Sequence, residues 1–247
     1  MSRVIEKISD FLQEMKGEDV GLFKFLYAKN NAKEGNNKVL YSGPYWDENE
    51  FIAIINSVLT GKWISSGENV HKFEKRFSKK FNVKQSLMVN SGSSANLVMI
   101  GSLKEVLGWA DGDEIILSAV GFPTTLSPII QNNLKPVFVD IEMETLNFDI
   151  DMVEASITPR TRAIFLSPVL GNTPNIDRLL DICHKNSVHL VLDNCDSLGS
   201  EWRDKYLNEY AIASSCSFYP AHHISTGEGG MVSSNNEEIV RKARSLA

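Results

Sequence analysis

The sequence lacks an uninterrupted apolar run long enough to cross a membrane. Its most apolar stretch, residues 115–130, is broken by serine, threonine, glycine and proline, whereas a membrane-spanning helix needs about 20 consecutive apolar residues. The opening Met-Ser-Arg-Val-Ile-Glu-Lys-Ile carries charges where a secretory signal peptide needs an apolar segment. We therefore expect a cytoplasmic protein with neither a membrane-spanning helix nor a signal peptide.

Cysteine is scarce as well, and positive charges are outnumbered by negative ones. The three cysteines, Cys183, Cys195 and Cys216, are widely spaced and form no Cys-x-x-Cys pair. An odd number at this spacing is typical of buried thiols in a reducing compartment, and it argues against a disulfide framework or a local zinc site. The formal net charge is −6, without a basic cluster. This balance argues against nucleic-acid and anionic-membrane partners, and we predict no metal site.

What the sequence does contain is a regular alternation of short apolar, β-branched runs with helical patterns. Short buried strands that alternate with helices predict an α/β fold, with a mixed, mostly parallel sheet and helices on both of its faces. The expected strands are 87–89, 114–117, 136–139, 163–166 and 190–192, followed by 214–219 and 230–233. The expected intervening helices are 94–107, 124–131, 152–157 and 176–185.

The segment before this alternation reads as helical. An amphipathic helix is expected at the N-terminus, with Val4, Ile8, Phe11 and Leu12 on one side, and a polar loop follows at residues 30–38. Helical patterns cover residues 47–59 and 69–81. Residues 70, 73, 77 and 81 of the second pattern are apolar at helical spacing, so we expect its aromatic rings in a core rather than on a ligand.

A last helical pattern begins at Asn235 or Asn236, which can cap it, and has Glu237 and Glu238 in its first turn. It reaches Ala247 without a glycine or proline terminator. We therefore expect the chain to be a piece of a longer protein. We divide it into a helical segment and loop over residues 1–45 and a large domain over residues 46–247.

Ligands of open α/β sheets gather at the carboxyl ends of the strands, and two small motifs stand there early in the chain. Asn90-Ser-Gly-Ser-Ser-Ala-Asn96 follows the first strand and opens a helix. Its amides at Ser93 and Ser94 suit a phosphate, although a simple capping turn is the alternative. Gly121-Phe-Pro-Thr-Thr125 follows the next strand. The Phe122 ring either stacks on a flat ligand or packs in the core.

Two acids stand at the end of a later strand, in Asp193-Asn-Cys-Asp-Ser-Leu-Gly199. An acid that ends a buried strand is costly unless it meets a positive partner or hydrogen-bond donors. Asp193 is therefore a candidate partner for a protonated ring nitrogen, with a helix cap or loop acid as the alternative. Asp196 is a second candidate at the same place.

The fourth motif, Ser217 to Gly230, reads Ser-Phe-Tyr-Pro-Ala-His-His-Ile-Ser-Thr-Gly-Glu-Gly-Gly. Ser217 offers a hydroxyl donor for a phosphate, and the glycines predict a tight turn into the next strand. A vicinal pair, His222 and His223, precedes that turn. No lysine occurs between Lys205 and Lys242, so this segment cannot hold a carbonyl cofactor through a lysine amine.

Together and in this order, the motifs resemble the DegT/DnrJ/EryC1/StrS sugar aminotransferases, a family of fold-type I pyridoxal-phosphate enzymes. The resemblance runs from about Trp63 to the end of the chain. Besides the four motifs it includes the segments 63–67, 73–74, 112–116, 136–140 and 161–164. Because His222 stands where the family has its Schiff-base lysine, the chain is most similar to the lysine-less branch, the nucleotide-linked 4-keto-6-deoxysugar 3-dehydratases.

The resemblance implies a fold-type I large domain over residues 46–247, with the smaller C-terminal domain missing. It also implies non-covalent pyridoxamine 5′-phosphate or pyridoxal 5′-phosphate as cofactor. The implied site consists of Ser93, Ser94 and Ser217 at the phosphate, Phe122 on the ring, Asp193 at the ring nitrogen, Asp196 at the ring hydroxyl edge or the substrate, and His222 as catalytic base.

The function that the resemblance implies is C3 dehydration of a nucleotide-linked 4-keto-6-deoxyhexose, in 3,6-dideoxysugar and lipopolysaccharide O-antigen biosynthesis. His222 would remove a proton from the cofactor methylene while Asp193 stabilises the charge that spreads into the ring. The C3 hydroxyl then leaves. Two alternatives stay open: a nucleotide-sugar aminotransferase, and a catalytically inactive cofactor-binding homologue.

The implied partners are a nucleotide-diphosphate-sugar substrate and, in the full-length protein, a second copy of the chain. In the CDP-linked branch of the family they also include a reductase. The [2Fe-2S] cluster of that branch would be held by residues beyond Ala247.

Overall fold

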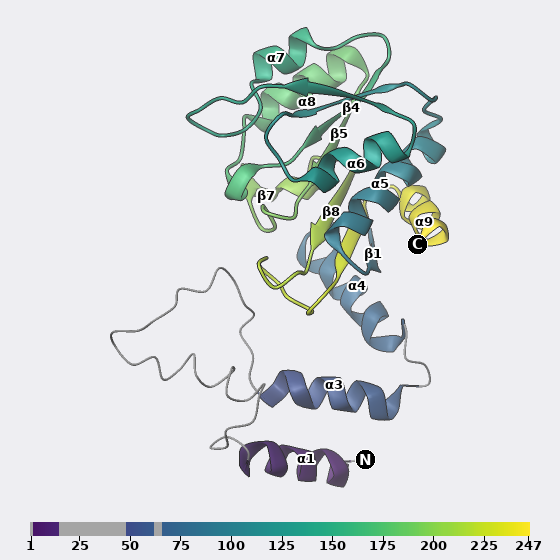
Figure 1. Cartoon of the computed structure of the whole chain (residues 1–247), viewed down its shortest axis with the longest axis vertical. Coiled ribbons are helices and arrows are strands. Elements are labelled where there is room, and N and C mark those ends of the chain that lie inside the picture. Colours follow the sequence, from purple (N-terminus) through teal and green to yellow (C-terminus); the bar gives the residue numbers. More distant parts are fainter. Residues whose placement is uncertain (1, 15–47, 62–65) are drawn as a thin grey trace. The chain divides into compact units, whose positions relative to one another are not determined.

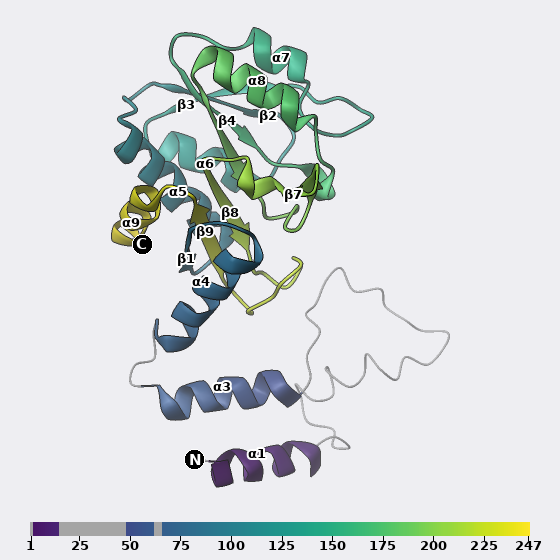
Figure 2. The same ribbon diagram turned by 180° about the vertical axis from the view of Figure 1, so that it is seen from behind.

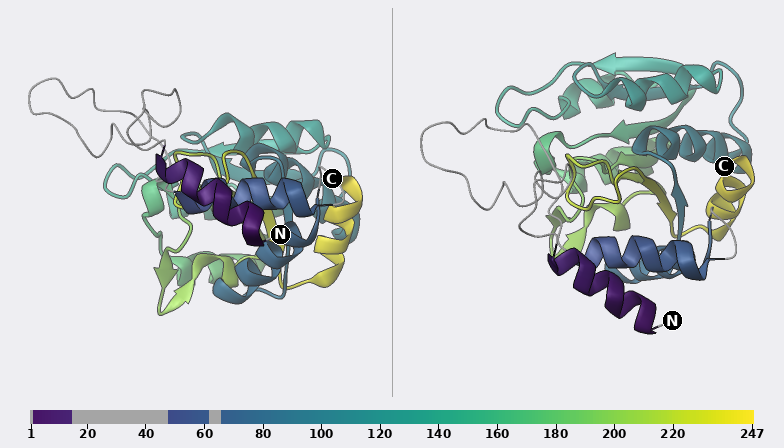
Figure 3. Two further views of the ribbon diagram at one scale, coloured as in Figure 1. Left: turned by 90° about the horizontal axis from the view of Figure 1, so that it is seen from below. Right: turned by 60° about the horizontal axis from the view of Figure 1, so that its bottom comes forward.

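The computed structural model describes residues 2–14, 48–61 and 66–247, which fall into two units, Met1–His71 and Lys72–Ala247. The first unit contains helix α1 (Ser2–Glu14) and helix α3 (Glu48–Thr60), which contact each other (Figure 3). Helix α1 lies within the predicted N-terminal helical segment, and α3 agrees with the helix predicted at residues 47–59 to one residue at each end. The predicted polar loop at residues 30–38, and residues 63–65 of one family motif, lie outside the described residues. In the described ranges, no helix is long and apolar enough to span a membrane.

The second unit is built on one sheet. Within residues 72–247 it has seven strands in the order β1-β9-β8-β5-β4-β2-β3. Neighbouring strands pair in parallel except β9, which is antiparallel to both β1 and β8. The predicted mixed, mostly parallel sheet is confirmed. The strands are β1 (Gln85–Val89), β2 (Glu114–Ser118), β3 (Lys135–Val139), β4 (Thr161–Leu166), β5 (His189–Asp193), β8 (Ala213–Ser217) and β9 (Gly230–Ser234).

Helices cover both faces of this sheet, as expected. Helices α5 (Gly92–Leu107), α6 (Pro123–Gln131) and α9 (Glu237–Leu246) pack on one face (Figure 1), and α7 (Ile150–Ala155) and α8 (Ile176–Asn186) pack on the other (Figure 2). Alternation along β2 shows why both faces are apolar. Ile115 and Leu117 join the core under α5, whereas Ile116 joins the core under α8. A strand buried on both sides therefore reads as a continuous apolar run.

A third cluster anchors the start of the histidine segment. Helix α4 (Glu68–Lys80) places Phe77, and Phe81 just after it, against Phe218, the residue that follows β8. The rings of Phe77 and Phe218 meet edge to face with centroids 5.8 Å apart, a geometry that adds to the energy of burial. The prediction that the α4 aromatics pack in a core is confirmed.

Local sequence signals explain the ends of the helices. The Ser91 hydroxyl caps α5 and Gly108 ends it in the left-handed conformation, with φ 68°. Asn236 caps α9 through the amide of Glu238, as predicted. A short hairpin of β6 (Glu201–Trp202) and β7 (Lys205–Tyr206) was not foreseen, because two-residue strands are too short to show an alternating pattern.

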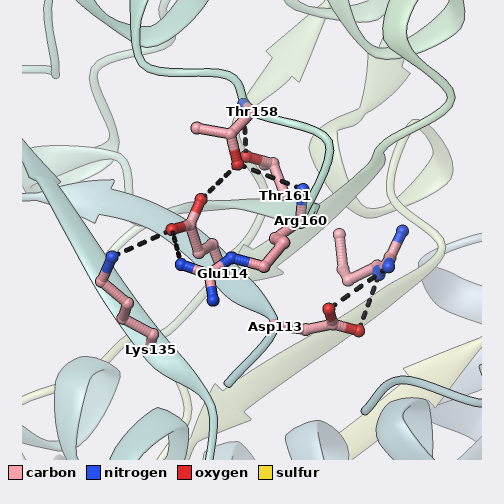
Figure 4. Close-up of polar contacts among 7 residues, drawn as sticks. Asp113, Glu114, Lys135, Thr158, Arg160 and Thr161 are labelled. Atoms are coloured by element: carbon pink, nitrogen blue, oxygen red, sulfur yellow. Dashed lines mark hydrogen bonds and ion pairs between the residues drawn. The ribbon is translucent and has the colours of Figure 1, made fainter. Parts of the chain in front are cut away.

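A polar network closes the amino ends of β2 and β4 (Figure 4). The buried Glu114 carboxylate accepts from the Thr158 hydroxyl at 2.5 Å and from the Lys135 ammonium at 3.0 Å. Beside it, Arg162 donates two hydrogen bonds to Asp113, at 2.7 and 3.2 Å. These bonds hold the pKa of both carboxyl groups below their ordinary values, led by Thr158 for Glu114 and by Arg162 for Asp113. The network lies at the edge opposite the one where the sequence motifs stand.

Candidate active site

The four motifs meet at one edge of the sheet. Strands β1, β2, β5 and β8 all run in the same direction, so their carboxyl ends point to the same edge. Strand β9 runs the opposite way and therefore begins there, at Gly230. The turn at Gly92, the ring of Phe122, the carboxylate of Asp193 and the hydroxyl of Ser217 are all carried to this edge by the ends of these strands.

The turn after β1 combines a helix cap with an anion-binding geometry. The Ser94 amide, one of the two predicted for a phosphate, donates to the Ser91 hydroxyl at 3.1 Å and is therefore engaged in the cap. The amides of Gly92 and Ser93 precede the first hydrogen bond of helix α5, so the helix itself gives them no acceptor. The helix N-terminus favours an anion at these two amides, and the contact of the Ser94 amide with a phosphate stays a prediction. The Ser93 hydroxyl donates to the Thr124 hydroxyl at 3.1 Å.

Two glycines let the backbone approach closely here. A Cβ atom at Gly92 would lie 2.5 Å from Cβ of Ser217, and one at Gly230 would lie 2.2 Å from the carbonyl oxygen of Ser91. Both distances are too short for real atoms, so β9, β8 and the turn after β1 fit together only with glycine at these places. Ser217 is buried and its oxygen accepts the Tyr219 amide at 3.3 Å. Its role as a hydroxyl donor to a phosphate stays a prediction.

Asp193 is 4% exposed and ends β5 among hydrogen-bond donors. Its Oδ2 atom accepts from the Thr125 hydroxyl at 2.7 Å and from the Asn96 amide at 2.8 Å. Its Oδ1 atom accepts from the Cys195 amide at 3.3 Å and from the Ser215 hydroxyl at 3.5 Å. The expectation that this buried acid meets donors is confirmed. These donors are neutral groups, so none of them is a positive partner for the Asp193 side chain.

The Phe122 ring is 68% exposed. Phe122 is the residue just before the N-terminus of helix α6, and Pro123 follows it in the first turn of that helix. The alternative reading of this ring as a core residue is wrong, because a core ring is covered on its faces. Stacking on a flat ligand stays a prediction, and the exposed face is what it needs.

His222 and Asp196 form a pair. Nδ1 of His222 lies 3.4 Å from Oδ1 of Asp196, and the imidazole is 20% exposed. The hydrogen bond with His222 lowers the pKa of Asp196 below its ordinary value. An imidazole whose Nδ1 faces a carboxylate presents Nε2 to the other side, which is the arrangement of an oriented general base. Asp196 thus lies beside the histidine, and its predicted place at the ring hydroxyl edge or the substrate stays a prediction.

The three cysteines do not have the properties of reactive nucleophiles. Burial raises the pKa of the Cys183 thiol to about 11, and burial also raises the pKa of Cys195 and Cys216. A raised pKa disfavours the reactive thiolate at neutral pH. Among the residues that the structure describes, no group of three or more histidine, cysteine, aspartate or glutamate side chains is arranged to hold a metal ion.

Asn96 and Thr125 contact the site and were not singled out from the sequence. Both lie inside motifs whose other members drew attention, the serines of the first motif and the aromatic ring of the second. One signal was present for Asn96. Asparagine is a poor helix former, and it occupies the second turn of a helix whose neighbouring positions are apolar or small.

The fold and the residues gathered at this edge define a class, the large domain of the fold-type I pyridoxal-phosphate enzymes. The solved structure of E coli GDP-4-keto-6-deoxy-D-mannose-3-dehydratase with bound hydrated PLP matches it with a TM-score of 0.77 and 37% identity, covering 82% of this chain and 52% of that one. A model of the DegT/DnrJ/EryC1/StrS aminotransferase family matches residues 46–247. The chain belongs to this family, which confirms the resemblance of its motifs.

Curated relatives place the chain near the 3-dehydratases of the family. The dTDP-4-dehydro-2,6-dideoxy-D-glucose 3-dehydratase of Saccharopolyspora spinosa is 42% identical over 216 residues, which are 86% of this chain and 46% of that protein. The GDP-4-keto-6-deoxy-D-mannose 3-dehydratase of Escherichia coli O55:H7 is 39% identical over 196 residues, 78% of this chain and 50% of that protein. The chain thus spans about half the length of the curated relatives it matches.

Proposed function

We propose that residues 46–247 form the cofactor-binding large domain of a pyridoxamine-phosphate-dependent 3-dehydratase that acts on a nucleotide-linked 4-keto-6-deoxyhexose. The observation that carries this proposal is the pair of His222 and Asp196, in a segment where the sequence has no lysine. A histidine moves protons but forms no stable imine with an aldehyde, so it favours elimination over amine transfer. The names of the relatives at 42% and 39% identity support the same reaction type.

The residues present fit a pyridoxamine phosphate. The Gly92 and Ser93 amides, with the Ser217 hydroxyl against them, offer donors to the phosphate. The buried Asp193, with neutral donors around it, suits a protonated ring nitrogen, and Phe122 offers an exposed ring face. When bound, this group supplies an amine for the sugar ketone and a conjugated ring that accepts negative charge.

The protein residues then divide the work between orientation and proton transfer. With the cofactor bound, His222 would remove a proton from its methylene carbon, as a positioned general base. Asp196 holds Nδ1 of that imidazole, which leaves Nε2 to act as the base. Asp193 would stabilise a positive charge at the ring nitrogen, and with it the negative charge that the ring accepts. The C3 hydroxyl of the sugar would then leave as water, with the proton that His222 has taken up.

On the same basis we propose the substrate, the location and the partners of the full-length protein. The substrate is a nucleotide-diphosphate-sugar, and the product serves 3,6-dideoxysugar and O-antigen assembly. The full-length protein acts in the cytoplasm as a homodimer. A [2Fe-2S] cluster and a reductase belong to it only if it follows the CDP-linked branch.

The test is borohydride treatment of the full-length protein loaded with pyridoxal 5′-phosphate, together with product identification by mass spectrometry. We expect the cofactor to leave on dialysis, no reduced cofactor–lysine adduct in the digest, and a 3-deoxy product from the keto sugar. A trapped cofactor–lysine peptide or a 4-amino-sugar product would instead identify an aminotransferase. Cofactor binding without hydrogen exchange at the methylene carbon would identify an inactive homologue. His222→Lys should abolish dehydration.

A further inference from the structure

Asn96 is connected to three segments of the candidate site at once. Its side-chain Nδ2 donates to the Asp193 carboxylate at 2.8 Å and to the backbone carbonyl of Thr124 at 3.1 Å. Its own backbone belongs to helix α5, whose first turn carries the candidate phosphate amides. One side chain therefore joins the turn after β1, the start of helix α6 and the end of β5.

Helix geometry explains why this position reaches the acid. Residues 92 and 96 are one turn apart on the same face of a helix. The Gly92 end of that face lies against Ser217, at the end of β8. Because β8 and β5 are neighbouring strands, the next turn of the same face lies against the end of β5, where Asp193 stands. Asparagine is short enough to span that gap and still reach the carboxylate.

The strengths of the four contacts to Asp193 are unequal. Both donors on Oδ2, the Asn96 amide and the Thr125 hydroxyl, lie at good hydrogen-bond distances of 2.8 and 2.7 Å. The donors on Oδ1 are at 3.3 and 3.5 Å, at or beyond the long end of the usual range. The orientation of the carboxylate is therefore set mainly from the Oδ2 side, which leaves Oδ1 as the less engaged oxygen.

Asn96 bears a cost that core packing alone does not explain. It is 1% exposed, and its Oδ1 atom has no hydrogen-bond partner among the described residues. A buried amide oxygen without a partner is unfavourable, and asparagine is a weak helix former. An apolar residue would remove both penalties. A local rule broken at one buried position, next to a ligand-binding edge, is the pattern of a functional residue.

We propose that Asn96 is a positioning residue for the cofactor: together with Thr125 it fixes Oδ2 of Asp193, so that Oδ1 faces the ring nitrogen. Through the Thr124 carbonyl it also sets the spacing between the phosphate turn and the segment that carries Phe122. This inference rests on the proposed function, since it assumes that a pyridine ring occupies this edge. It adds two side chains to that site that contact Asp193 rather than the ring itself.

The test compares four forms of the full-length chain: the wild type, Asn96→Leu, Thr125→Val and the control Asn208→Leu. Asn208 is also buried, also donates from Nδ2 to a backbone carbonyl, that of Phe81 at 2.7 Å, and also has an unpartnered Oδ1 in the described chain. It lies before β8, at the opposite edge of the sheet. Any loss of stability that follows from replacing a buried asparagine should therefore appear in both leucine variants. An effect on the ring nitrogen should appear in Asn96→Leu and be absent from Asn208→Leu.

The measurements are the affinity for pyridoxamine 5′-phosphate by calorimetry and the pH titration of its 15N-labelled ring nitrogen by NMR. For Asn96→Leu we expect binding about tenfold weaker or more and a ring-nitrogen midpoint lower by about 1 pH unit. Thr125→Val keeps the shape of the side chain and should move the midpoint in the same direction. Asn208→Leu should leave both quantities at the wild-type values.

The outcomes separate this inference from the proposed function. If the wild type binds no pyridoxamine phosphate, the proposed function fails and the positioning role fails with it. If the wild type binds and Asn96→Leu shows the same affinity and midpoint, only the positioning role is overturned. If Asn96→Leu does not fold, Thr125→Val decides: an unchanged midpoint overturns the role of the Oδ2 contacts, and a lowered midpoint supports it.

Discussion

Nδ1 of His222 lies 3.4 Å from Oδ1 of Asp196, so the imidazole and the carboxylate of two separate motifs form one unit. Asp196 follows β5 and His222 follows β8, and these strands are neighbours in the sheet. The pairing is therefore a consequence of strand order, which brings residues 26 positions apart to one place. Asp196 gives the histidine a partner that fixes the orientation and the tautomer of its ring. A lysine at the same position would not need such a partner.

This pairing predicts the effect of Asp196→Asn. The amide keeps the size of the side chain but loses the charge that holds the imidazole. We expect hydrogen exchange at the cofactor methylene to slow by about 10- to 100-fold, short of the roughly 10²–10⁴ that a whole general base contributes. Cofactor affinity should change little, because Asp196 acts through His222. Exchange is measured by mass spectrometry in deuterated buffer, and affinity by calorimetry. A large loss of affinity with normal exchange would place Asp196 on the cofactor instead.

The strand pattern and the site edge were predictable because both depend on local sequence. β-branched runs at regular spacing predicted β1 to β5, and the rule that ligands gather at carboxyl ends predicted where Asp193 and Ser217 stand. What was not predictable is which partner each side chain meets. Asp196 could be placed at the site from its motif, but its contact with His222 depends on the distance between two loops.

The same limit explains the residues that were missed. Asn96 and Thr125 reach Asp193 from two different helices, and nothing in the sequence around either residue indicates that long-range contact. Ser94 shows the same limit. Its amide is predicted to bind a phosphate and donates to the Ser91 hydroxyl as a cap in the structure, and the balance between capping and ligand binding depends on geometry that the sequence does not show.

The exposed ring of Phe122 predicts a separation of stability from binding. Because the ring is 68% exposed, Phe122→Ala should leave the melting temperature nearly unchanged. Loss of a stacking partner should weaken binding of pyridoxamine phosphate by about 2- to 10-fold. Phe138→Ala is the matched control, since that ring is 52% exposed on strand β3 and should leave binding unchanged. If Phe122→Ala instead lowers the melting temperature and preserves affinity, the ring is structural.

The network at Glu114 and Asp113 predicts a pH dependence of stability. Both folded pKa values are lowered from the ordinary 4.5 and 3.8. A carboxyl group with a lowered folded pKa stabilises the protein fully above its ordinary pKa, and this contribution is lost as the pH falls through the folded value. The free energy of unfolding should therefore decline as the pH falls below about 4.5. Urea titrations at a series of pH values measure it.

Single substitutions test whether the network at Glu114 and Asp113 causes this decline in the free energy of unfolding. Glu114 is buried, and among the described residues its Oε2 atom accepts only from the Thr158 hydroxyl, whereas Lys135 and Arg160 both donate to Oε1. Thr158→Val should cost about 1–3 kcal/mol at neutral pH, the penalty for leaving a buried acceptor without its donor. Asp151→Asn is the control, because that carboxylate pairs with Arg178 at the surface and should not change stability measurably. Equal effects of the two variants would contradict the burial argument.

The tightest contact at the site is the approach of Gly230 to the turn after β1, and it predicts that alanine is not tolerated there. A Cβ atom would lie 2.2 Å from the carbonyl oxygen of Ser91 and 2.8 Å from the amide nitrogen of Gly92. Both neighbours are backbone atoms, so relief requires β9 to move away from the helix end rather than a side chain to rotate. That movement would displace one of the two amides proposed to bind phosphate. We expect Gly230→Ala to lower the melting temperature by several degrees, about 2–4 °C for each kcal/mol lost in a chain of this size. It should also weaken binding of pyridoxal phosphate in any folded fraction.

Gly121→Ala is the control for melting temperature, because nothing lies within 4 Å of a Cβ atom at that position. If the Gly230→Ala protein is as stable as the Gly121→Ala protein, β9 and the turn after β1 adjust without strain. The fit between them would then not depend on glycine at position 230.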